Sequence, residues 1–276
     1  MEMFFYGFMQ RAFQASLLIA IIAPILGLFL ILRRQSLMAD TLSHVSLVGI
    51  ALGFLLNLNP TFTTLIVVMV VAVILEYLRI EFKSYSEVSL AILMSGGLAL
   101  ALVLMSFVDG GTNTSIDQFL FGSIVTISPE QVQILAALCV ISVVMYFVFR
   151  KPMYVLTFDE DTAFTAGLPV RLMSICFNVL VGVAIAVIMP IAGSLLVSAI
   201  LILPAAIAMR MSKHFDYVIL VGIVIGIIGM LSGLSVSYYA GTPAGATIAL
   251  VFIALFVVTS IGKQAAKQFR KKNDIV

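Results

Sequence analysis

Asp40 and His44 are the residues whose types and spacing best suit a chemical role, because both are ionisable and both open a long apolar run. Four positions apart on a helix, they would lie on one face, about 6 Å apart along the axis. A carboxylate and an imidazole that converge in this way are suitable ligands for a first-row divalent cation. An Asp–His hydrogen bond, or Asp40 capping the helix, explains the same residues equally well.

Two ligands do not complete a metal site. If the protein were a symmetric dimer with this face on the axis, two carboxylates and two imidazoles would satisfy tetrahedral zinc. The residues alone do not establish this arrangement of Asp40 and His44, and it stays a hypothesis.

The composition shows which kind of fold must position this pair. Of the 276 residues, 62% are hydrophobic and 10% are charged. A soluble domain carries about 25% charged residues, so this composition excludes a water-soluble enzyme. The apolar runs are continuous rather than alternating, which argues against a transmembrane β-barrel. We therefore expect an all-α, polytopic membrane protein with a single transmembrane domain over residues 1–276.

Nine apolar runs are candidates for membrane-spanning helices. The seventh run contains Ser194, Ser198 and Pro204, so it is expected to be broken or to span incompletely, and eight full spans is the alternative. The predicted runs are 13–32, 38–57, 60–79, 88–107, 131–149, 172–190, 192–209, 217–239 and 246–262.

The Lys and Arg residues predict the orientation. When the nine runs alternate in direction, every Lys and Arg except Arg11 falls on one side. The positive-inside rule makes that side cytoplasmic, and it includes the basic C-terminal tail, 263–276.

The connection between the fifth and sixth runs is a second candidate site. Asp159, Glu160 and Asp161 suit a helix N-terminus, and Gly167 suits the position that ends a helix. The sequence predicts a short amphipathic helix within about 157–167 that lies on the cytoplasmic surface. It would expose two aromatic side chains, Phe158 and Phe164. Because so short a helix is marginal in water, contact with a partner protein would explain it.

Four further polar residues are candidates for lining a pathway through the membrane, although hydrogen bonding between helices is the commoner use of such residues. They are Ser43, Asn178, Ser194 and Ser198. Glu76 lies three residues before Arg79 and is expected to form an ion pair with it at the membrane surface.

The chain resembles, nearly end to end, the metal ABC-3 permeases, which are the membrane subunits of bacterial ABC importers for zinc and manganese. Residues 157–164 are especially similar to the zinc permeases of Gram-positive cocci. Many relatives have Gly and Ala where this chain has Ala39 and Val45, and neither change removes a ligand. The resemblance is carried by residues 33–44, 49–53, 193–199, 203–206, 237–238 and 243–247.

The resemblance implies a type II importer fold, a homodimer in the bacterial plasma membrane, a cytoplasmic ABC ATPase dimer and an extracellular metal-binding lipoprotein. It makes Asp40 and His44 metal ligands on the translocation path, and 157–167 the coupling helix that meets the ATPase. The expected function is a permease subunit for a divalent metal, most of all zinc, with manganese or iron as alternatives. No resident cofactor and no nucleic acid partner is expected.

Two other classes are weighed against this one. An ion-driven secondary transporter would usually show paired, broken inverted repeats and more acids within the membrane. An intramembrane enzyme would need a second carboxylate or a Ser/His pair facing the membrane. The sequence also has no Gly-rich phosphate loop ending in Lys-Ser/Thr, so ATP hydrolysis is expected on another chain.

Overall fold

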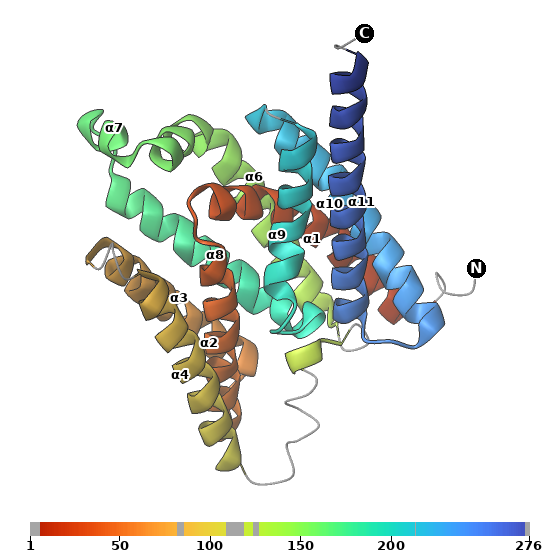
Figure 1. Ribbon diagram of the computed structural model, residues 1–276. Helices are drawn as coiled ribbons and strands as arrows, with labels where there is room; N and C mark the ends of the chain where they lie inside the picture. The colour runs from red at the N-terminus through yellow and green to blue at the C-terminus, as the bar shows by residue number, and fades with distance from the viewer. Residues whose placement is uncertain (1–5, 82–85, 109–118, 124–126, 213, 274–276) are drawn as a thin grey trace.

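The computed structural model describes residues 6–81, 86–108, 119–123, 127–212 and 214–273, and over these residues the chain is helical and contains no strand. Figure 1 shows the helices as one bundle. Their bounds are α1 Gly7–Leu32, α2 Ser36–Leu55, α3 Pro60–Glu81, α4 Ser86–Ser106, α6 Pro129–Phe158, α7 Glu160–Thr165, α8 Val170–Ala192, α9 Val197–Met211, α10 Phe215–Ala240 and α11 Ala244–Asn273.

Among the described residues, eight helices are long and apolar enough to cross a membrane, so the chain is a multi-pass membrane protein, as the composition predicted. The ninth apolar helix, α9, has 15 residues and is about 22 Å long, shorter than the ~30 Å hydrocarbon core. The alternative of eight full spans is therefore favoured, and the seventh run begins at Val197 rather than at residue 192.

The break between α8 and α9 is built by backbone contacts with the segment 119–123. Ser194 N–H donates to Phe119 C=O at 2.9 Å, and Ser123 N–H donates to Pro190 C=O at 3.1 Å. Gly193 has φ +88°, a conformation that L side chains rarely adopt. The break therefore satisfies polar backbone groups that would otherwise be exposed to an apolar environment. Residues 119–121 of this segment are helical.

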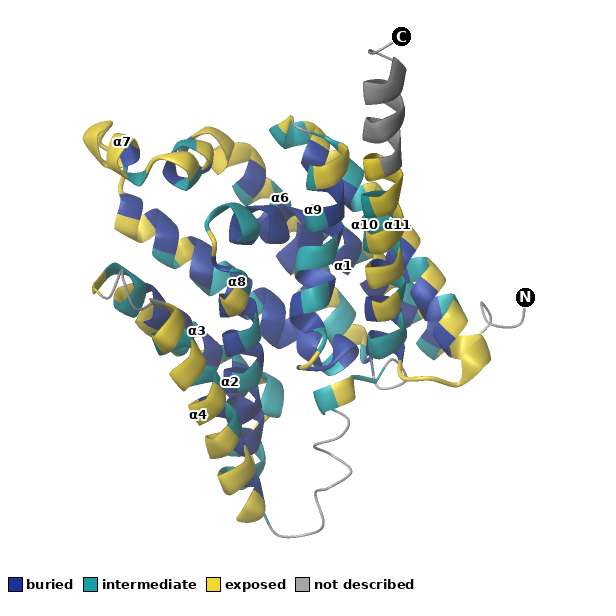
Figure 2. Ribbon diagram, viewed as in Figure 1, coloured by how far each residue is buried: buried dark blue, intermediate teal, exposed yellow. Residues whose placement is uncertain are grey.

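The core of the bundle is formed around α1 and α2. Helix α1 packs against α6, α9 and α10, while α2 packs against α3, α4 and α8. The α2–α3 contact is close: a Cβ on Gly49 would lie 2.4 Å from Thr64 Cα, and one on Gly53 would lie 2.6 Å from Pro60 Cα. Figure 2 shows exposed residues along α4 and α11, and many of these are large and apolar, as expected for a surface that faces lipid.

Helix α6 differs from its predicted bounds, 131–149. It begins two residues earlier, with Ser128 as N-cap, Pro129 in the first turn and a capping box completed by Gln131. It then continues through Pro152 to Phe158. Phe158 thus ends α6, and the separate surface helix, α7, covers only six residues of the predicted 157–167.

Arg33, Arg79, Arg150 and Arg210 lie at or toward the C-terminal ends of α1, α3, α6 and α9, and we call this end of the bundle the basic end. Arg79 contacts Glu160 of α7, Arg150 pairs with Asp216 of α10, and Arg210 C=O accepts from Lys263 of α11. Arg11 instead bonds to Ile127 C=O, just before α6 begins at the opposite end. The described part of the chain therefore separates these cations as the alternating runs predicted.

Candidate metal site

The turn before α2 fixes where the candidate ligands lie. Arg34 has φ +57°, and the next N–H, of Gln35, donates to Leu30 C=O at 2.8 Å. Together with the bond from Arg34 N–H to Ile31 C=O, this is a Schellman motif, which ends α1 and lets α2 start immediately. Asp40 and His44 consequently lie in the first half of α2, on the side of the basic end.

Asp40 and His44 share one face of α2. Both are half-buried, whereas Ala39, Thr41 and Ser43 beside them are buried. The Asp40 charge acts on the His44 imidazole, and His44 Nδ1 is buried with no hydrogen-bond partner among the described residues. The Asp–His hydrogen bond that the sequence left open is therefore not formed at Nδ1. A carboxylate and an imidazole on one partly open face can both serve as ligands of a divalent metal.

The predicted pathway residues are spread over α2, α8, the α8–α9 connection and the start of α9. Ser43 is buried, and its hydroxyl donates to Ala39 C=O at 2.9 Å within α2. Asn178 lies near the start of α8 and Ser194 follows its end, so about 21 Å of helix separates them. Ser194 Oγ is buried with no hydrogen-bond partner in the part of the chain that the structure describes, and Ser198 is buried near the start of α9.

The segment predicted to meet a partner lies on the surface of the basic end. Asp159 caps α7, its carboxylate accepting from the Thr162 N–H at 2.9 Å and also from the Thr162 hydroxyl. These bonds lower the pKa of Asp159 from its usual value. Phe158 is 60% and Phe164 is 74% exposed, and Asp161 is exposed with them. Gly167 ends the helix with φ +77°, as its position predicted.

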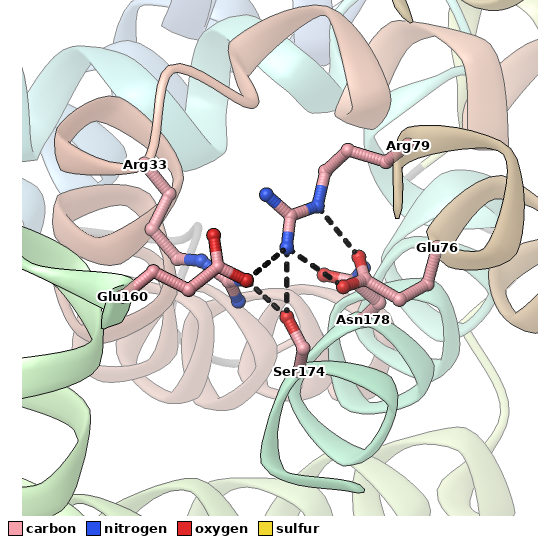
Figure 3. A network of polar contacts seen from close by, with 6 residues as sticks. All are labelled: Arg33, Glu76, Arg79, Glu160, Ser174 and Asn178. Carbon is pink, nitrogen blue, oxygen red and sulfur yellow. Dashed lines mark hydrogen bonds and ion pairs between the residues drawn. The ribbon is translucent and has the colours of Figure 1, made fainter. Parts of the chain in front are cut away.

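A cluster of charged and polar residues at the basic end is the feature that the sequence revealed only in part. Glu76 and Arg79 form the predicted ion pair, with Arg79 Nη2 2.8 Å from Glu76 Oε1. The Asn178 amide also donates to Glu76, so its role here is a hydrogen bond between α8 and α3. Figure 3 shows the polar cluster: Arg33, Glu76, Arg79, Glu160, Ser174 and Asn178. The sequence around Arg33 and Ser174 does not indicate that they belong to this cluster, because tertiary packing brings them together.

Three comparisons place this geometry among known proteins. Residues 5–263 match the family described as the ABC 3 transport family. A "Probable metal transport system membrane protein" of Treponema pallidum is 31% identical, covering 94% of this chain and 98% of the relative. The "High-affinity zinc uptake system membrane protein ZnuB" of Buchnera aphidicola is 28% identical, covering 90% of this chain and 95% of the relative.

The solved structures give the same result for the fold. The structure titled "PsaBC from Streptococcus pneumoniae in complex with Fab" has 27% sequence identity and a TM-score of 0.83, and the match covers 94% of this chain and 92% of that one. Other relatives are named for manganese transport in Halalkalibacterium halodurans, at 25% identity, and for chelated iron transport in Yersinia pestis, at 29%. With the family match over nearly its whole length, this chain belongs to the ABC 3 transport family, as a membrane-spanning metal permease.

Proposed function

We propose that this chain is the permease subunit of an ATP-driven importer of zinc, and that Asp40 and His44 bind the metal during transport. The single observation that carries the proposal is this pair: a carboxylate and an imidazole one turn apart on α2, with His44 Nδ1 buried and without a hydrogen-bond partner among the described residues. An ionisable group within the membrane costs about 2.5–3.5 kcal/mol on insertion scales, so each needs a compensating role. Metal binding supplies one for both side chains.

A homodimer would complete the site. Asp40 and His44 supply two ligands, and tetrahedral zinc needs four. A second copy, related by a twofold axis along the open face of α2, supplies the other carboxylate and imidazole. The metal would then be held between the two subunits, and movement of α2 in both would open the path.

The relatives support a metal as cargo but differ in which one. Their names specify zinc, manganese or chelated iron. Zinc is our choice because two carboxylates and two imidazoles suit its tetrahedral preference, and because residues 157–164 resemble zinc permeases most. Manganese, which prefers more oxygen ligands, is the principal alternative.

The remaining partners follow from charge and exposure. Positive residues favour the cytoplasmic side, so we propose that the basic end and the C-terminus face the cytoplasm. The exposed Phe158 and Phe164, with the acids of α7 beside them, then meet the cytoplasmic ATPase dimer. The opposite end receives metal from an extracellular metal-binding lipoprotein.

The test is metal uptake in a bacterial strain that lacks its own zinc and manganese importers. The strain expresses the chain with the ATPase and binding protein of the same transport system. Accumulation of radioactive zinc and manganese is measured for wild type, Asp40→Asn and His44→Gln, at matched membrane levels. Glu81→Gln, which neutralises an exposed carboxylate at the end of α3, is the control.

We expect wild type and Glu81→Gln to accumulate zinc, and both ligand variants to lose at least tenfold. Uptake by Asp40→Asn and His44→Gln at the wild-type rate would contradict the proposed site. Preferential uptake of manganese would support the importer function but would show that manganese, not zinc, is the transported metal.

A further inference from the structure

The polar cluster of Figure 3 joins helix α7 to the turn that precedes α2. Arg33 caps the end of α1, two residues before α2 is capped by Gln35. Glu160 is the first residue of α7, and Arg79 lies near the end of α3. A continuous set of polar contacts therefore runs from the surface helix to the turn just before the helix that carries Asp40 and His44.

The two arginines of this cluster differ in the carboxylates that contact them. Arg79 contacts two carboxylates: Glu76, through Nε at 3.0 Å and Nη2 at 2.8 Å, and Glu160, through Nη2 at 3.5 Å. Arg33 donates only to the Ser174 hydroxyl, and its Nη1 is buried with no partner among the described residues. Burial and the nearby Arg79 lower the pKa of Arg33 to about 10, so it remains charged at neutral pH.

Glu160 is within electrostatic reach of both cations. Its charge acts on Arg79 and also on Arg33, on which the charge of Glu76 acts more strongly. The Glu160 side chain is 41% exposed and its contact with Arg79 is long, so this ion pair is weak and easily exchanged. Glu76, in contrast, is fully buried and fixed by Arg79 and Asn178. Of the two carboxylates, Glu160 is the one that is free to move.

A cavity leaves space for a second arrangement of the Glu160, Arg33 and Arg79 side chains. A cavity of about 370 Å³ is lined by Arg33, Arg79 and Glu160, among others. Gln35 and Asn178 line the same cavity, and the Gln35 side-chain amide and Asn178 Oδ1 are buried with no hydrogen-bond partner among the described residues. Buried polar groups are seldom left without a partner, so a second arrangement that satisfies them would explain these two.

We propose that Glu160 is a positioning residue that exchanges its ion pair between Arg79 and Arg33, and so transmits movement of α7 to the start of α2. In the arrangement seen here, Glu160 is paired with Arg79. When α7 moves, the carboxylate passes to Arg33, which forms no ion pair among the described residues, and the turn before α2 moves with it. The inference rests on the proposed function, since it assumes that α7 receives the movement from an ATPase.

The test compares zinc import with ATP hydrolysis in the same proteoliposomes, which contain the permease, its ATPase and its binding protein. Glu160→Gln and Arg33→Gln remove the two charges from different elements. Both are expected to import at least fivefold less zinc per ATP hydrolysed, with ATP hydrolysis within twofold of wild type. Arg33→Lys keeps the cation and is expected to restore at least half of the wild-type ratio. Glu81→Gln again serves as the control.

Loss of import and ATP hydrolysis in equal proportion would overturn the inference, because it would assign these residues to stability or docking alone. A wild-type ratio in both Gln variants would overturn it as well. If the wild-type complex imports neither zinc nor manganese, the proposed function itself fails, and this result is distinct from either of the others.

Discussion

Glu76 is closed off from solvent and accepts two hydrogen bonds from the Arg79 guanidinium, at 3.0 and 2.8 Å, one helical turn further along α3. The pair is also joined to α8, because the Asn178 amide donates to the same carboxylate. A buried carboxylate held in this way neutralises the cations that helix packing brings to the basic end. Because Glu76 and Arg79 hold each other in place, the more exposed Glu160 can move relative to charges that stay fixed.

Neutralising Glu76 should destabilise the fold. Glu76→Gln leaves Arg79 without its buried counter-charge, and breaking such a pair from one side costs about 3 kcal/mol. The free energy of unfolding in detergent is the measurement. Glu81→Gln removes an exposed carboxylate of the same helix and should stay within about 0.5 kcal/mol of wild type. Equal stability of the two variants would show that Glu76 is not a structural counter-charge.

The cap of α7 should make this helix sensitive to acid. The bonds from Thr162 lower the pKa of Asp159 in the folded protein, so their stabilisation is present at neutral pH. It is lost as the pH falls through that lowered value. Amide exchange in α7, corrected for intrinsic rates, should show protection at pH 7 that decreases in acid, and Asp159→Ala should decrease it already at pH 7. Unchanged protection in Asp159→Ala would contradict this role.

Much of the fold could be predicted because its signals are local. Long apolar runs predicted the spanning helices, and Gly167 predicted the end of α7. The Glu76–Arg79 pair followed from a spacing of three residues within one helix. In each case the residues that determine the structure are neighbours in the sequence.

The features that could not be predicted depend on packing between distant segments. Helix α6 continues through Pro152, although Pro removes one backbone donor, and no local pattern indicated this. The late start of α9 depends on contacts with residues 119–123. Arg33 and Ser174 are 141 positions apart in the sequence, so only the folded chain reveals their hydrogen bond.

The left-handed residue between α1 and α2 gives a further prediction. Arg34 occupies the position of a Schellman motif where Gly is preferred, with φ +57°. Arg34→Gly should therefore be more stable than Arg34→Ala by about 1 kcal/mol, because only the Ala variant keeps a Cβ in this conformation. The comparison of two small residues removes the effect of the lost charge. Equal unfolding free energies would indicate that the turn relaxes to another conformation.

The break between α8 and α9 should depend on the absence of a side chain at Gly193. A Cβ there would lie 2.4 Å from Leu120 C=O, and φ is +88°, so both space and backbone oppose a substitution. Gly193→Ala should cost at least about 2 kcal/mol of unfolding free energy. Gly96→Ala in α4 is the matched control: a Cβ there meets nothing within 4 Å, and Ala should stabilise the helix by about 0.5–1 kcal/mol. If both variants had the same unfolding midpoint in detergent, the contact between 119–123 and the α8–α9 connection would not hold the break in place.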